Sequence, residues 1–196
     1  MSQDPVRAET AAPGTLSIDE AINPFVKRAV LYWRAVRGDR RFPARGELTL
    51  RGMASILPYC VIISVIDGGA DFEYRYVGDA QRQAFKTSFK GLRLSLIEGV
   101  VPQLGAVLRS VYEHACALGL PFLVRGAVDH DPADPRMLYH ETVFLPLGAS
   151  DAAVDHILVV GVQIPRPYWT IPAVTLTSFA DRLCAEALGP KSETAP

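Results

Sequence analysis

Four side chains with the chemistry of metal ligands stand out in this chain of 196 residues. His114 and Cys116 are two positions apart in a predicted helix, so they point to different sides and do not form a shared metal site. His130 lies in the acidic loop DHDPADP, which lacks the residue spacing of a calcium-binding EF-hand. His140, in a predicted strand, could bind a haem iron, although a lone strand histidine is more often simply hydrogen-bonded. The sequence therefore predicts no metal site and leaves any cofactor unknown.

The acidic residues leave one catalytic alternative open. The sequence contains no GxSxG motif, no phosphate-binding loop, no histidine-kinase motif and no Cys/His pair at a persuasive spacing. A small cone-like α+β isomerase needs a carboxylate in a cavity, and Asp79 or Glu141 could act as that base. We treat this enzyme as the alternative to a protein without catalytic activity.

The run FEYRYVG, residues 72–78, alternates in the manner of a β-strand. In a regular strand, Phe72, Tyr74 and Tyr76 share one face. These rings either fill the core or line a ligand cavity together with the long helix that follows, and a buried tyrosine hydroxyl needs a hydrogen-bond partner. The candidate ligand-binding residues are Phe72, Tyr74, Tyr76, Phe85, Leu108 and Tyr112.

Arg75 stands among these aromatic residues and could anchor an anionic ligand. Alternation places it on the face opposite the rings, beside Glu73, where charged residues of half-covered sheets commonly pair. Asp19 and Glu20 of the preceding helical segment are alternative partners. We therefore expect a structural role for Arg75, and a backbone role for Gly78, where the strand ends and the chain turns.

Composition and charge are those of an ordinary globular domain. The chain is 49% hydrophobic, and 20 basic and 21 acidic residues leave a formal net charge of -1. The longest apolar run, CVIISVI, is far too short to span a bilayer, and the first residues lack the order of a secretory signal. Cys60, Cys116 and Cys184 are odd in number and widely spaced, which indicates reduced thiols in a cytoplasmic protein.

The segment from Lys27 to Arg51 is basic, with eight arginines and lysines against two acids. It could contact nucleic acid or an acidic protein surface. Such a run is more often a solvated face, and apart from Tyr32 and Trp33 it lacks the interleaved aromatic residues of a stacking surface. We therefore expect a small-molecule ligand and a protein partner, and neither a nucleic acid nor a membrane.

Hydrophobic periodicity and turn residues predict the order of helices and strands. Ser17 and Glu20 have the spacing of a capping box, and Asn23 followed by Pro24 marks a helix start. A long helix should end at Gly119. The other predicted helices are 24–37, 50–57, 79–89 and 173–188, with an irregular segment at 91–97; the predicted strands are 59–66, 72–77 and the runs PFLVRGAV, RMLYHETVFLPL and HILVVGVQI.

Three longer runs are informative together: LYWRAVRGDRRFPARGEL, ILPYCVIISVIDGGADFEYRYVG and FLPLGASDAAVDHILVVGVQ. Over residues 25–164 they resemble a family of single-domain PAS proteins common in alphaproteobacteria. That family tends to have Tyr-Trp near the start, Arg-Pro-x-Arg in a link, Leu-Pro before the first strand, Phe-x-Tyr-Arg-x-x-Gly in the second, and Leu-Pro-Leu near the end. The matching residues are Tyr32, Trp33, Pro43, Arg45, Leu57, Pro58, Phe72, Tyr74, Arg75, Gly78, Leu145, Pro146 and Leu147.

The chain departs from the family at three places. Phe42 stands where arginine is usual, and Asp79 follows the glycine of the second strand where threonine is usual. The run SFKG, residues 88–91, replaces an Asp-(Leu/Phe)-Thr-Gly run on the helical side of the expected cavity. The resemblance therefore implies a fold and a class of protein, and no particular ligand.

The resemblance and the element order predict an α+β fold of the PAS type. A five-stranded antiparallel sheet would carry helices on one face and an N-terminal flanking helix on the other. The divisions are 1–16 (disordered), 17–164 (PAS-like domain) and 165–196 (C-terminal helical extension). The resemblance implies a non-catalytic cytoplasmic sensory or regulatory protein that acts through a small ligand or a protein partner. We also expect a homodimer through helix 24–37, because PAS domains often dimerise through a flanking helix.

Overall fold

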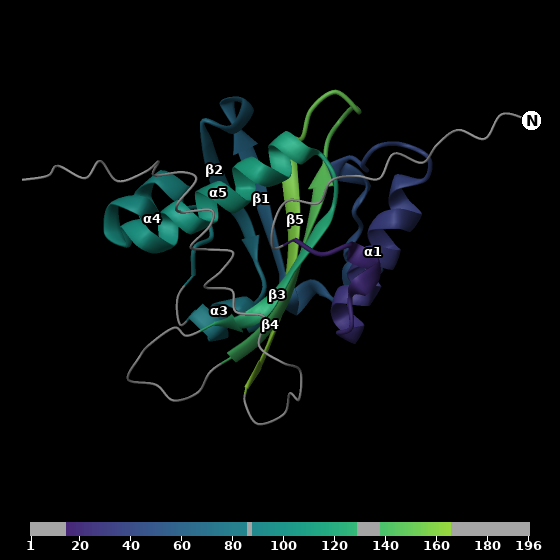
Figure 1. Ribbon diagram of the computed structural model, residues 1–196. Helices are drawn as coiled ribbons and strands as arrows, with labels where there is room; N and C mark the ends of the chain where they lie inside the picture. The colour runs from purple at the N-terminus through teal and green to yellow at the C-terminus, as the bar shows by residue number, and fades with distance from the viewer. Residues whose placement is uncertain (1–14, 86–87, 129–137, 166–196) are drawn as a thin grey trace, which may run out of the picture.

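The computed structural model describes residues 15–85, 88–128 and 138–165 (Figure 1). Most of the N-terminal segment expected to be disordered, the loop with His130, and the C-terminal extension with its predicted helix lie outside these residues. Leu16 exchanges two backbone hydrogen bonds with Leu123, so pairing begins one residue before the predicted domain boundary. Within the described ranges, no helix is long and apolar enough to cross a membrane.

Five antiparallel strands form one sheet in the order β2-β1-β5-β4-β3. The turn of the β1–β2 hairpin holds Asp67 and Gly68 at positive φ angles of 47° and 70°, which explains the glycine-rich sequence there. The predicted α+β class with a five-stranded antiparallel sheet is therefore confirmed. The strands are β1 (Cys60–Ile66), β2 (Asp71–Val77), β3 (Phe122–Val128), β4 (Leu138–Leu147) and β5 (His156–Pro165).

Helix α1 (Pro24–Arg37) covers one face of the sheet, over β4 and β5 (Figure 1). Its predicted start is confirmed, because Asn23 Oδ1 accepts a hydrogen bond from the Phe25 amide and a proline opens the first turn. Trp33 Nε1–H donates to the Pro146 carbonyl at 2.8 Å and joins the helix to β4. The apolar stripe of α1 is buried against the sheet of the same chain; its buried residues are Val26, Ala29, Val30 and Trp33.

Three helices cover the opposite face of the sheet: α3 (Asp79–Phe85), α4 (Leu94–Val100) and α5 (Pro102–Leu118) (Figure 1). As predicted, α5 ends at Gly119, which has a left-handed conformation. Helix α3 is shorter than expected. Before β1, the predicted helical piece is a single turn, α2 (Leu50–Met53), followed by a 3₁₀ turn at Leu57–Tyr59.

The segment expected to be irregular, 91–97, contains the start of α4, so that expectation is wrong. Leu94 and Ile97 are one turn apart and both are buried. The residue before α4 provides no side-chain cap for the helix. Asp71 of β2 caps α4 instead, because the Asp71 carboxylate accepts hydrogen bonds from the Ser95 amide at 3.2 Å and from the Ser95 hydroxyl at 2.7 Å. A cap from a distant strand leaves no local signal in the sequence.

The sheet separates two hydrophobic cores. One lies under α1 and includes Trp33, Phe42, Leu145 and Leu158. The other lies under α4 and α5 and is rich in aromatic rings, among them Phe72, Tyr74, Tyr112, Phe122 and Phe144. Each central strand therefore presents apolar side chains on both faces, in agreement with the nearly continuous apolar run of β1.

A β-bulge in β2 breaks the alternation that the sequence suggests. Ile63 pairs with Tyr74 and Ile62 pairs with Tyr76, so Arg75 is an extra residue opposite one step of β1. Beyond the bulge the faces exchange, and Tyr76 turns to the α1 core, where its hydroxyl donates to the Leu57 carbonyl at 3.3 Å. The prediction that Tyr76 shares a face with Phe72 and Tyr74 is therefore wrong.

The structural roles expected of Arg75 and Gly78 are confirmed. Arg75 is exposed and its guanidinium lies 2.7 Å from the Glu73 carboxylate, one of the expected partners. At Gly78 a Cβ atom would lie 2.3 Å from the Pro58 carbonyl oxygen, so only glycine permits this approach of two backbone segments.

Candidate functional site

A cavity of about 260 Å³ lies between the sheet and helices α3 and α5, and we call it the central cavity. Four of the six predicted ligand-binding residues line it: Tyr74, Phe85, Leu108 and Tyr112. Phe72 is fully buried beneath it, with its ring centroid 5.3 Å from that of Tyr112. Tyr76 lies on the other side of the sheet because of the bulge. The wall is mostly apolar, from residues such as Val61, Val77, Val107, Val111, Val124, Phe144 and Val159.

Two tyrosines on opposite walls form a buried hydroxyl pair. The Oη atoms of Tyr74 (β2) and Tyr112 (α5) are 3.0 Å apart. Burial raises the pKa of Tyr74 to about 12 and the pKa of Tyr112 well above its usual value, so both phenols stay neutral. Two hydroxyls carry two protons and their mutual bond uses one, so one O–H donor has no acceptor among the described residues.

A polar cluster closes another part of the cavity wall. Gln81 of α3 is buried, and its Nε2 donates to the carbonyls of Tyr59 and Gly161 at 2.9 and 2.5 Å. Both amide protons are thereby used, whereas no described residue donates to Oε1. Next to it, His140 Nδ1 lies 3.0 Å from Thr142 Oγ1 on β4. Gln163 of β5 completes the cluster.

Sequence reasoning missed the polar residues other than His140. His140, Thr142 and Phe144 alternate along β4, and Val159, Gly161 and Gln163 alternate along β5. The register places Thr142 opposite Gly161, where a glycine leaves room for the threonine hydroxyl: a Cβ atom would lie 2.9 Å from Thr142 Oγ1. The sequence indicates that side chains alternate along β4 and β5, but it does not indicate which face of these strands lies toward the helices and the cavity.

The two acids considered as catalytic bases lie away from the central cavity. Glu141 is fully buried on the α1 side of the sheet, where its carboxylate accepts from the amides of Ile22 and Asn23 and from Arg125 Nε at 2.8–3.2 Å. Asp79 pairs with Arg82 on the exposed surface of α3. Neither is positioned to remove a proton from a ligand in the cavity.

The candidate metal ligands are dispersed. His114 packs edge-on against Phe122, with ring centroids 5.1 Å apart, and His140 lines the central cavity. Burial raises the pKa of the Cys60 thiol to about 12 and that of Cys116 to about 11, so both are protonated at neutral pH. In the described part of the chain, no three histidine, cysteine or acidic side chains gather as a metal site would require. Cys184 and His130 lie outside that part.

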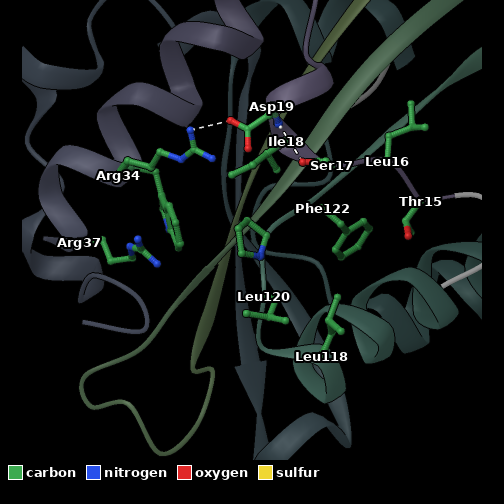
Figure 2. A pocket seen from close by; sticks show the side chains of 12 residues that line it. Thr15, Leu16, Ser17, Ile18, Asp19, Arg34, Arg37, Leu118, Leu120 and Phe122 are labelled. Carbon is green, nitrogen blue, oxygen red and sulfur yellow. Dashed lines mark hydrogen bonds and ion pairs between the residues drawn. The ribbon is translucent and has the colours of Figure 1, made fainter. Parts of the chain in front are cut away.

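A second pocket, of about 480 Å³, lies between α1 and the connection from α5 to β3, and we call it the lateral pocket. Figure 2 shows Arg34 and Arg37 of α1 on one side and Leu118, Leu120 and Phe122 on the other. Its described lining shares no residue with that of the central cavity. No sequence prediction concerned this site.

Comparison of the chain with protein-family models, with curated proteins and with solved structures finds no match. The fold and the two pockets are therefore the observations on which a function must be argued.

Proposed function

We propose that this protein is a PAS-type sensory or regulatory domain of the cytoplasm, which binds a small neutral molecule in the central cavity and passes occupancy to a protein partner by contact. The order of elements supports the PAS assignment: a hairpin, an excursion of helices α3 to α5, and three further antiparallel strands, with α1 on the opposite face. The proposal of a ligand rests on the apolar cavity between the sheet and the helices. In that cavity the Tyr74–Tyr112 pair has one O–H donor without an acceptor among the described residues.

The volume of the cavity limits the size of the ligand. An engineered apolar cavity of about 150 Å³ admits benzene, and sites for drug-sized molecules begin at about 300 Å³. At about 260 Å³, the central cavity suits a molecule of one to two rings or an aliphatic chain of similar bulk.

The wall of the cavity favours a neutral ligand with a hydrogen-bond acceptor. Its described lining contains no lysine, arginine, aspartate or glutamate, so an ionic ligand would lose its hydration without gaining a countercharge. The Tyr74–Tyr112 pair offers one O–H donor, and a carbonyl or ether oxygen would accept it. Gln81 Oε1 can accept from a donor at another position of the ligand.

The proposed role is non-catalytic. The isomerase alternative requires a carboxylate that reaches the ligand, and the positions of Glu141 and Asp79 favour the sensory role over it. A catalytic role would be revived if the protein converted a cavity ligand and the His140→Ala variant did not, because the His140 imidazole lines the cavity.

Thermal denaturation with 2-acetylnaphthalene tests the proposal, because this neutral molecule has two rings and one carbonyl acceptor. A ligand at 100 times its dissociation constant adds about 2.7 kcal/mol, which should raise Tm by roughly 5–11 °C in a chain of this size. The cation 2-naphthylmethylamine should give no shift.

Two tryptophan substitutions provide a matched pair of variants. Leu108→Trp fills the cavity and should abolish the shift in Tm, whereas Leu31→Trp, on the exposed side of α1, should preserve it. A screen of neutral ring compounds without any shift in Tm, or a shift that Leu108→Trp leaves unchanged, would contradict ligand binding in the central cavity.

A further inference from the structure

Arg37 of the lateral pocket is a partly buried cation, and no acidic side chain of the described residues forms a salt bridge with it. Its guanidinium lies over the Trp33 ring, 5.1 Å from the ring centroid. Its Nε atom is buried and has no hydrogen-bond partner in the described part of the chain. A buried guanidinium donor that is left unpaired costs free energy. The Nη groups are not among the buried unpaired atoms, and a ring beneath the guanidinium leaves their in-plane N–H bonds available to a ligand.

We propose that the lateral pocket binds a monocarboxylate with an aromatic or aliphatic body, and that Arg37 holds the carboxylate. This site shares no described residue with the central cavity. Its ligand would be an anion, whereas the ligand proposed for the central cavity is neutral, so the proposal does not depend on the proposed function. The planar fork of a guanidinium matches a carboxylate through two parallel hydrogen bonds.

The charges in the pocket favour one negative charge on the ligand. Arg34 is already paired with Asp19, at 2.8 Å, and the hydrogen bond from Arg34 lowers the pKa of that carboxyl. The pair is therefore neutral as a unit, and among the described lining residues Arg37 contributes the remaining positive charge. A phosphate dianion would meet one free guanidinium and the Asp19 carboxylate, whereas a carboxylate monoanion is balanced by Arg37 alone.

The rest of the pocket suits an apolar body. Opposite the arginines, Figure 2 shows the apolar side chains of Leu118, Leu120 and Phe122, at the end of α5 and the start of β3, and Pro121 also lines the pocket there. The apolar residues and the Arg37 guanidinium therefore lie on opposite sides of the pocket, so an amphipathic molecule could contact both at once. Its volume of about 480 Å³ lies within the usual range for small-molecule sites.

The test uses Trp33 as a reporter, because it lines the pocket beneath Arg37. The chain has two tryptophans, so titrations are made in a Trp169→Phe background, where Trp33 is the one indole that fluoresces. The probes are 3-phenylpropionate and its neutral analogue 3-phenylpropanamide. We expect saturable binding of the carboxylate, and affinity at least ten-fold weaker for the amide, the ratio that corresponds to one charge-assisted hydrogen-bonded pair.

Arg37→Gln should weaken 3-phenylpropionate binding at least ten-fold, while the exposed Arg51→Gln should leave it unchanged. If Arg37→Gln fails to fold, the same question can be tested by NMR on the unaltered chain. The Arg37 Nε–H resonance should shift on titration with 3-phenylpropionate and stay in place with 3-phenylpropanamide. Equal affinities for acid and amide, no binding of the carboxylate, or an Nε–H resonance that does not respond would overturn the proposal.

Discussion

Glu141 is expected to stabilise the fold by joining helix α1 to the sheet. Its carboxylate is fully buried and accepts hydrogen bonds from the Ile22 and Asn23 amides, just before α1, and from Arg125 of β3. Glu141→Ala removes all of these acceptors at once. It leaves two amides and the Arg125 guanidinium, whose side chain is only 17% exposed, without their partner.

The expected loss is large because a buried ion pair loses one member. Breaking such a pair costs about 3–5 kcal/mol. A single domain is stable by about 5–15 kcal/mol, so the loss is a large fraction of the total. In a chain of this size it should lower Tm by roughly 6–20 °C. Glu141→Gln keeps an oxygen acceptor but loses the charge, and should cost about 1–3 kcal/mol.

Urea unfolding of Glu141→Ala, of Glu141→Gln and of the exposed control Glu113→Ala measures these free energies. Glu113 lies 3.8 Å from Arg109 at the surface, so its removal should cost less than about 1 kcal/mol. In the double variant Glu141→Ala/Arg125→Ala, part of the loss should be recovered relative to the sum of the single variants, by about 1–3 kcal/mol. A Glu141→Ala variant as stable as the control would refute the structural role.

Three more outcomes are expected. Burial raises the pKa of Tyr74 to about 12, so its contribution to stability is complete below the unfolded-state pKa and is lost as pH rises through the folded-state value. Unfolding measurements from about pH 9 to 12 should show this fall, and changing both Tyr74 and Tyr112 to Phe should flatten it. Gly78→Ala should destabilise the fold by about 1–3 kcal/mol, because its Cβ would lie 2.3 Å from the Pro58 carbonyl oxygen, and an unchanged Tm would contradict that contact. A homodimer through α1 must use the outer side of the helix, so Leu31→Glu, at a position 66% exposed, should give a monomer in light scattering; a monomeric mass for the unaltered chain at micromolar concentration rules the dimer out.

Local signals in the sequence predicted much of the framework. The Asn23–Pro24 start of α1, the Gly119 end of α5 and the hairpin at Asp67–Gly69 all depend on residues that are neighbours in the chain, and the structure confirms each. The apolar runs in the sequence also predicted all five strands. A strand that is covered on both faces needs a continuous apolar run, and such a run is a local feature of the sequence.

The errors concern contacts between distant segments. Helix α4 takes its cap from Asp71 on β2, so its own sequence holds no start signal. The bulge at Arg75 depends on how β2 pairs with β1, and it moved Tyr76 out of the candidate site. The lateral pocket is assembled from α1 and from the α5–β3 connection, which are far apart in the chain, and therefore no motif indicated it.

Nuclear Overhauser contacts between methyl groups and bound 2-acetylnaphthalene would locate the probe within the protein. We expect contacts from the ring protons of the probe to the methyl groups of Val124 and Val159, which line the central cavity. We expect none to Val30 or Leu145, which lie in the core under α1 on the other side of the sheet. Contacts confined to residues outside the cavity, or no binding by this or any other neutral ring compound, would contradict the claim that the protein senses a small molecule there.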